Sequence, residues 1–237
     1  MKTVDILLYD GVDELDFCGP YETLASCRRL VDGKWSEKPA FHVQTVADKR
    51  STVSCSHGLC VLPDKSLAQA FEADIIIVPG GPGARRETLP LHVFEFLRSA
   101  SDTAEIIASV CTGAFILAKA GLGDGHQMTT HTAQVEALAK AYPHVQVVKG
   151  ARVVNGGGFL MSSAGMTAGI DLALAIIARY EGKETARLAA RRLEWPGNWT
   201  EATVHTAHGP MQAPTHAPAH STNHVPPMPP ARKTAAR

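Results

Sequence analysis

The sequence lacks the features that mark nucleic-acid-binding, membrane and secreted proteins. Lysine and arginine together number 23, as do aspartate and glutamate, so the formal net charge is zero and no basic excess attracts nucleic acid. No apolar run approaches the roughly 20 residues that a membrane helix needs. The opening stretch, MKTVDILLYDG, is interrupted by Asp5 and Asp10, which predicts that it is not a secretory signal.

Cysteines are few and irregularly spaced. Their number, five, is odd, and no two are spaced as C-x-x-C, which argues against a disulfide framework and against a structural zinc site. We therefore expect a protein of the reducing cytoplasm. The five are Cys18, Cys27, Cys55, Cys60 and Cys111.

Apolar strands and helices alternate along most of the 237 residues, which predicts an α/β fold. The expected architecture is a three-layer sandwich with a mostly parallel sheet and helices on both faces. Ligands of such sheets bind at the carboxyl ends of the strands. We expect strands at 4–9, 41–46, 74–78, 105–110, 127–130, 145–148, 152–155 and 159–162, with shorter ones near 53 and 59–62. We expect helices at 15–29, 91–100, 115–120, 133–141, 167–180 and 184–193.

The composition changes near Trp195. The segment 196–237 contains eight prolines and five histidines and has no apolar periodicity. We therefore expect a folded domain over 1–195 and a disordered Pro/His-rich tail over 196–237. The tail histidines imply no fixed metal-ligand geometry, so a solvated tail is the simpler interpretation. They are His205, His208, His216, His220 and His224.

The segment SVCTGAFILAKAGL (109–122) places Cys111 directly after a predicted buried strand and before a predicted helix. Gly113 and Ala114 are small, as a sharp strand-to-helix turn requires when it presents a nucleophile. The start of the helix would lower the thiol pKa, and the Thr112 N–H would point at charge that develops during a reaction. The alternative is that Cys111 is a small core residue.

A second turn, VPGGPGARR (78–86), follows another predicted buried strand. Gly80 and Gly81 would let backbone amides approach a ligand and would add an oxyanion donor. Alternatively, the turn needs glycine only for a positive φ. It is not a phosphate-binding loop, because no GK[ST] follows, and the GxGxxG dinucleotide pattern is absent.

Three acidic residues follow the first predicted strand, in GVDELDFCGP (11–20). Asp13 and Glu14 are explained most simply as acids that complement the dipole at a helix N-terminus. Asp16 lies further into the helix. Burial beside a cysteine would keep its carboxyl group protonated, so that it could donate a hydrogen bond to a thiolate or act as a general acid.

Taken in this order, these elements resemble the ThiJ/PfpI superfamily, whose flavodoxin-like fold is that of the class I glutamine amidotransferases. The resemblance covers about residues 3–193. Within the superfamily the chain is most similar to the isonitrile hydratase group and to the domain at the front of some AraC-type regulators. The segments that carry it are ELDFCGPYETLA (14–25), IIIVPGGPG (75–83), ASVCTGAFILAKAGLGDG (108–125), MTTHTA (128–133) and SSAGMTAGIDLAL (162–174).

The resemblance implies an enzyme of the lyase class that adds water to an isonitrile, R–N≡C, and releases an N-substituted formamide. It implies a small-molecule substrate, no metal or other cofactor, and a homodimer. Cys111, Asp16 and Thr112 match the catalytic positions. Gly81, with Gly80, would complete an anion-binding pocket. For His131 two roles stay open, lining the site or capping the next helix.

Positions at which this chain departs from related groups narrow the range of reactions that we expect it to catalyse. Thr112 stands where peptidase and Cys-His glyoxalase members have histidine, and no His-x-Glu pair of the amidotransferases follows Thr167 in the folded region. Thr132 follows His131 where this group has tryptophan, which predicts a more open or more polar pocket. The alternatives are a redox or stress-responsive protein or a ligand sensor that uses Cys111 without isonitrile turnover, and a glyoxalase- or deglycase-type enzyme. We expect no DNA-binding module in the short tail.

Overall fold

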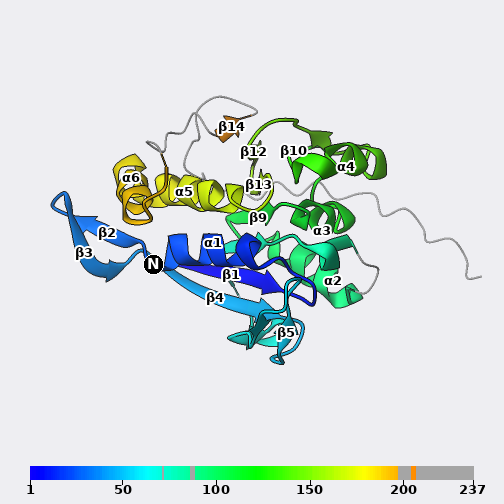
Figure 1. The fold of residues 1–237 in the computed structure, drawn as a ribbon, viewed down its shortest axis with the longest axis horizontal. Coiled ribbons are helices and arrows are strands. Elements are labelled where there is room, and N and C mark those ends of the chain that lie inside the picture. Colours follow the sequence, from blue (N-terminus) through cyan, green and yellow to red (C-terminus); the bar gives the residue numbers. More distant parts are fainter. Residues whose placement is uncertain (71, 86–88, 197–203, 207–237) are drawn as a thin grey trace, which may run out of the picture.

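The computed structural model describes residues 1–70, 72–85, 89–196 and 204–206. Its centre is an eight-stranded sheet in the order β14-β12-β13-β9-β8-β1-β4-β7 (Figure 1). All neighbouring strands are parallel except β12 and β13. The strands are β1 (Lys2–Leu8), β4 (Phe41–Ala47), β7 (Lys65–Ser66), β8 (Ile75–Val78), β9 (Ile106–Val110), β12 (Val153–Gly157), β13 (Leu160–Ser163) and β14 (Val204–Thr206).

Helices cover both faces of the sheet, as the alternation of strands and helices predicts. On one face α1 (Glu14–Ala25), α5 (Ala168–Glu181) and α6 (Lys183–Arg192) form one packed group. On the other face α2 (Leu91–Ala100) packs against α3 (Gly113–Lys119). The predicted α/β sandwich is therefore confirmed. The remaining helical segments are η1 (Leu67–Gln69), η2 (Pro82–Arg85), η3 (Thr132–Gln134) and α4 (Val135–Ala141).

The central strands are apolar along their whole length because helices cover both of their sides. Every residue of β8 and β9 is buried. The α5 helix is buried nearly all round, as its sequence AGIDLALAIIARYE predicts for a helix in the core. The core therefore lies on both sides of β8 and β9.

Four neighbouring strands, β13, β9, β8 and β1, run parallel to one another, so their carboxyl ends meet at one edge of the sheet. The segments that follow them, 164–167, 111–112, 79–81 and 9–13, therefore lie together. This edge is where ligands bind in open parallel sheets.

Smaller strand pairs lie outside the main sheet. The predicted short strands near 53 and 59–62 form an antiparallel hairpin of β5 (Val53–Ser54) and β6 (Cys60–Val61). The segments predicted at 127–130 and 145–148 form a separate parallel pair, β10 (Gln127–Met128) and β11 (Gln146–Val147).

One helix boundary was predicted wrongly. The helix expected over 15–29 ends at Ala25, and the next residues form a hairpin of β2 (Arg28–Val31) and β3 (Lys34–Pro39), which projects from the sandwich in Figure 1. The hairpin turns at Asp32 and Gly33, whose φ angles are 52° and 71°. Asp-Gly with two positive φ angles is the composition that two-residue hairpin turns favour.

The expectation of disorder after residue 196 is wrong for Val204–Thr206. These residues form β14, which pairs in parallel with β12, and the Nε2 of His205 lies 3.1 Å from the Oε1 of Gln127. The rest of the predicted tail, apart from Pro196, lies outside the described residues. In the described part of the chain, no helix is long and apolar enough to span a membrane.

Candidate active site

Cys111 occupies the turn between β9 and α3 in a strained backbone conformation. Its φ angle is 56°, which is uncommon for a residue other than glycine. Its N–H donates to the carbonyl oxygens of Ser163 (3.1 Å) and Ala164 (3.2 Å), and its carbonyl oxygen accepts the Thr130 hydroxyl at 2.8 Å. Strain held in place by surrounding hydrogen bonds is a feature of functional sites. The strand-turn-helix path is that of a nucleophile elbow.

The small residue after the turn is a steric requirement. A Cβ atom on Gly113 would lie 2.0 Å from the carbonyl oxygen of Val78. The α3 helix therefore starts in direct contact with the end of β8, and only glycine fits there. This contact explains the glycine in the Cys-Thr-Gly sequence.

Asp16 lies beside Cys111, as predicted. It is fully buried in α1, and its Oδ2 and Oδ1 accept the backbone N–H groups of Gly80 (3.1 Å) and Met166 (3.0 Å). Its carboxylate and the Sγ of Cys111 lie within 4.8 Å of each other. The carboxylate is thus fixed by the ends of β8 and β13 and faces the thiol at the end of β9.

Gly80 and Gly81 shape the same region by their lack of side chains. A Cβ atom on Gly80 would lie 2.5 Å from the Thr112 nitrogen and 2.7 Å from the Asp16 carboxylate. The N–H of Gly81 donates to the Thr112 hydroxyl oxygen (2.9 Å), and that hydroxyl donates to the Gly81 carbonyl (3.2 Å). Both glycine amides are therefore engaged within the protein. Gly81 also has a positive φ of 130°, the alternative considered for this turn.

Burial dominates the acid–base properties of the pair. It raises the pKa of the Asp16 carboxyl group to about 6. Burial and the Asp16 carboxylate raise the pKa of the Cys111 thiol to about 12, although the Thr112 N–H acts in the opposite direction. The predicted lowering of the thiol pKa is therefore wrong, because burial is the largest cause of the shift. Near neutral pH the pair holds one proton, which rests on the sulfur and can pass to the carboxylate.

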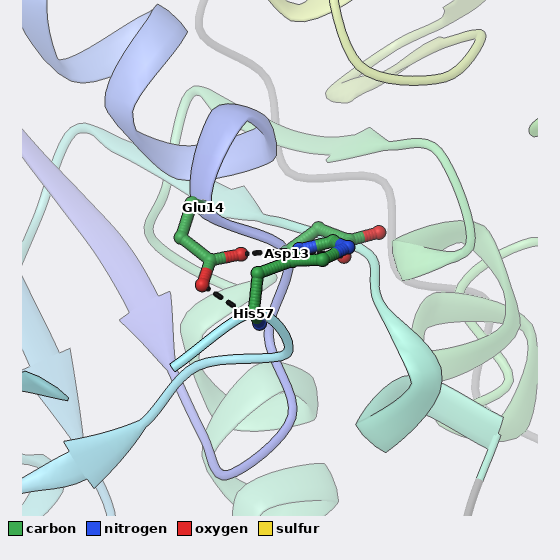
Figure 2. A group of neighbouring side chains, drawn as sticks. All are labelled: Asp13, Glu14 and His57. Atoms are coloured by element: carbon green, nitrogen blue, oxygen red, sulfur yellow. Dashed lines mark hydrogen bonds and ion pairs between the residues drawn. The ribbon is translucent and has the colours of Figure 1, made fainter. Parts of the chain in front are cut away.

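Asp13 belongs to two groups of potential metal-ligating side chains. With Asp16 and Cys111 it forms a buried group, and with Glu14 and His57 it forms a group near the surface. In each group the candidate ligand atoms lie within 4.8 Å of one another. Figure 2 shows the second group, in which Glu14 and His57 are joined by hydrogen bonds. Asp13 and Glu14 therefore do more than complement the helix dipole.

His131 caps the next helical segment, one of the two roles considered for it. Its Nδ1 accepts the N–H of Ala133 and so caps the start of η3. Its ring also lines a cavity of about 170 Å³ and lies against Gly165, where a Cβ atom would be 2.3 Å from its Cδ2. Cys111, Asp16 and Thr112 are not among the residues that line this cavity, but two of its lining residues, Thr130 and Ala164, hydrogen-bond to the Cys111 backbone. The other lining residues are Thr129, Thr132, Val135, Gly150, Ala151 and Arg152.

Sequence reasoning missed several residues of the site. Met166 holds Asp16 through its backbone N–H, and Thr130 holds the Cys111 carbonyl. Asp171, in the first turn of α5, is buried and accepts the Arg152 Nε–H at 2.7 Å and the Trp195 Nε1–H at 3.1 Å. Backbone donors and distant partners leave no pattern in a sequence. The threonine pair of MTTHTA, directly after a short strand, was the one available signal.

Fold and site together define an α/β-sandwich protein with a cysteine elbow. Residues 2–179 match the DJ-1/PfpI family. The chain is 35% identical over 194 residues to an isonitrile hydratase of Pseudomonas putida, a match that covers 81% of this chain and 78% of that relative. The chain belongs to the DJ-1/PfpI family, and the predicted superfamily is confirmed.

Other relatives share the fold but differ in kind. An HTH-type transcriptional regulator of Pseudomonas aeruginosa, GbdR, is 29% identical over 183 residues, which are 77% of this chain and 48% of the regulator. The chain thus spans about half the length of that regulator. Among solved structures, a ThiJ/PfpI family protein from Pseudomonas syringae superposes with a TM-score of 0.71 at 26% identity, covering 83% of this chain and 76% of that one. The family therefore includes both an enzyme and regulators.

Proposed function

We propose that the protein is a cysteine-dependent hydratase that converts an isonitrile to an N-substituted formamide. The observation that carries the proposal is the buried Asp16 carboxyl group, held by two backbone N–H groups beside Cys111 on a strained elbow. The similarity to an isonitrile hydratase supports the same reaction. The pair holds one transferable proton near neutral pH, as the chemistry requires.

The first step forms a carbon–sulfur bond. With the shared proton on Asp16, the Cys111 thiolate attacks the terminal carbon of R–N≡C. Asp16 delivers its proton to that carbon, and the product is the thioimidate R–N=CH–S–Cys. The Thr112 N–H faces the sulfur and stabilises the thiolate before attack.

The second step releases the product with water. The Asp16 carboxylate removes a proton from the attacking water, whose oxygen bonds to the thioimidate carbon. Asp16 passes that proton to the nitrogen, the hydroxyl of the tetrahedral intermediate returns its own proton to Asp16 as the carbon–sulfur bond breaks, and R–NH–CHO leaves. One water is consumed in total, and Cys111 and Asp16 regain the single proton with which they started.

The substrate side chain would lie in the cavity beside His131. Threonine side chains and His131 make its wall polar, in agreement with the expected effect of threonine at position 132. Gly80 and Gly81 would keep the space between Asp16 and Thr112 free of side chains. A His131→Ala variant should therefore raise KM more than it lowers kcat.

Formamide release from cyclohexyl isocyanide tests the proposal. Turnover should be present in the wild type, absent in Cys111→Ala and at least about 100-fold lower in Asp16→Asn. Cys60→Ser, which changes an exposed thiol outside the elbow, should keep full activity. Absence of turnover in the wild type, with Cys111 still reactive to a thiol probe, would favour redox or ligand sensing.

We also propose the homodimer that the resemblance implies. Light scattering on a size-exclusion column should give twice the mass of the 25.3 kDa chain. A mass of one chain across the concentrations at which activity is measured would contradict it.

A further inference from the structure

Asp13 connects the buried Cys111–Asp16 pair to the protein surface. Its carboxylate lies within 4.8 Å of the reacting atoms of both residues. The same carboxylate accepts the hydroxyl of Ser56, which lies in the turn between β5 and β6. A line of proton-binding groups, hydrogen-bonded to one another from Asp13 outward, therefore leads from beside the buried pair to the surface.

His57 ends this line in solvent. Its side chain is 72% exposed, and its Nδ1 lies 2.8 Å from the Ser56 hydroxyl and 2.8 Å from the Glu14 Oε2. Its backbone N–H donates to the other Glu14 oxygen at 2.8 Å, so the residue is held at both ends (Figure 2). The ring is thereby fixed with Nδ1 toward Ser56 and Asp13.

We propose that His57, Ser56 and Asp13 form a proton relay between solvent and the Asp16–Cys111 pair. The inference rests on the proposed function, in which the pair must hold a single proton before each attack; the relay restores that proton from solvent whenever the pair has lost it. His57 and Ser56 are positioning residues here, because neither touches the reacting atoms.

The proton transfers balance along the line. The imidazolium of His57 gives its Nδ1 proton to the Ser56 oxygen as that hydroxyl gives its own proton to the Asp13 carboxylate. Asp13, now neutral, passes a proton to the Asp16 carboxylate, through a bridging water where the gap exceeds a hydrogen bond. His57 then takes a proton from solvent. The reverse sequence releases a proton.

Glu14 keeps His57 in place without joining the transfer. Burial opposes its ionisation, but hydrogen bonds, first from His57, outweigh that effect and hold its pKa at about 2. The hydrogen bond to Glu14 in turn raises the pKa of His57. A group that stays ionised at neutral pH orients the imidazolium and holds no relayed proton. Other titratable side chains on the elements around His57 are Asp10, Cys18, Cys55 and Cys60.

Chemical rescue tests the relay. His57→Gln should lower kcat about tenfold, below the usual range for positioned proton transfer because solvent still supplies protons slowly. Added imidazole should restore it, since it can occupy the exposed place of the ring. Ser56→Ala, which interrupts the relay inside the protein, should lower kcat by as much, and added imidazole should not restore it. Unchanged kcat in His57→Gln, or equal rescue of both variants, would overturn the relay.

His92→Gln is the matched control. His92 is 50% exposed and, like His57, is paired with a carboxylate, that of Asp48, but it lies at the start of α2 outside the site. It should keep kcat and show no response to imidazole. Thermal unfolding of all the variants checks that they are folded.

A second measurement separates the relay from the proposed function. Failure of the wild type to hydrate any isonitrile would remove the function, and the alkylation rate of Cys111 at neutral pH would then decide on the relay. Loss of the imidazolium charge near Asp13 should lower this rate about twofold in His57→Gln, and less at high salt. A rate equal to that of His92→Gln would overturn the relay.

Discussion

Asp16 and Cys111 come from a helix and from the end of a central strand, yet the carboxylate and the sulfur lie within 4.8 Å and hold one proton between them near neutral pH. This arrangement predicts how the thiol reacts. Alkylation of Cys111 by iodoacetamide should stay slow through neutral pH and rise only at strongly alkaline pH, because burial and the ionised Asp16 hold the thiol pKa at about 12.

The Asp16→Asn variant should react at lower pH than the wild type. Its thiol loses the neighbouring carboxylate, one of the two causes that raise its pKa, and burial alone then holds that pKa above its ordinary value. A wild-type thiol that is alkylated at pH 7.5, with a variant that is not, would mean that Asp16 carries the shared proton.

The same pair predicts a pH dependence of stability. The folded-state pKa of Asp16, about 6, lies above its ordinary value of 3.8. Burial therefore destabilises the fold when Asp16 is ionised, and this contribution lowers stability as the pH rises from about 4 to 6. The fall should be smaller in Asp16→Asn, and urea unfolding at several pH values measures it. An equal fall in both proteins would contradict the assigned pKa.

Gly80→Ala should damage the site. The added Cβ would approach the Thr112 nitrogen to 2.5 Å and the Asp16 carboxylate to 2.7 Å, and backbone has little room to move. We expect a loss of about 1–3 kcal/mol in the free energy of unfolding and a marked loss of Cys111 reactivity. Gly19→Ala is the control, because its Cβ would meet chiefly the side chain of Ile170, at 3.1 Å.

Thr112→Val should separate the contribution of the threonine hydroxyl to stability from that of its branched shape. Valine keeps the branched side chain but leaves the N–H and carbonyl of Gly81 without the partner that Thr112 supplies. The free energy of unfolding should fall by about 1–3 kcal/mol. Thr112→Ser, which keeps the hydroxyl, should lower the free energy of unfolding by less. Equal urea midpoints for the valine variant and the wild type would show that the hydroxyl pair contributes nothing.

Much of this site could be predicted because the residues that follow each buried strand can be recognised in the sequence. A buried strand followed by Cys-Thr-Gly, another followed by Pro-Gly-Gly, and an acid after the first strand locate Cys111, Gly80 and Asp16, and parallel order brings strand ends together. The direction of the Cys111 pKa shift could not be predicted from the sequence, because it depends on how deeply Asp16 and the thiol are buried.

Other parts depend on contacts between distant segments. The Met166 N–H reaches Asp16 across most of the sequence, and Trp195 reaches Asp171 from beyond the last helix. The β2–β3 hairpin is different, because its Asp32-Gly33 turn was visible and was overridden by the expected length of the preceding helix. Local turn chemistry was the better guide there.

Asp171→Ala should destabilise the fold without touching the elbow. The buried carboxylate accepts Arg152 and the Trp195 indole, and its loss leaves both donors without it. We expect the free energy of unfolding to fall by about 3 kcal/mol, the low end for a broken buried ion pair, because Arg152 is 46% exposed. Glu184→Ala, which breaks the exposed pair with Arg187, should change the unfolding free energy by less than about 0.5 kcal/mol.

Two truncations test the contribution of β14. A chain that ends at Thr206 keeps the pairing of β14 with β12, and a chain that ends at Pro196 loses it. The shorter chain should unfold about 2–4 °C lower, the shift that 1 kcal/mol produces at this size. Its activity should be unchanged, because the site is built from other strand ends. Equal melting temperatures would mean that β14 adds no stability.

The lack of space for a side chain at Gly113 limits which positions of the molecule can be varied in protein engineering. A side chain there would overlap the Val78 carbonyl, so a library that varies this position would consist mainly of misfolded chains. The exposed and half-buried part of the cavity wall, at Thr132, Gly150 and Ala151, is the contrasting region, where replacement side chains do not disturb the contacts of the elbow. Selection for new substrates should therefore accumulate changes in that wall while the cysteine turn stays as it is.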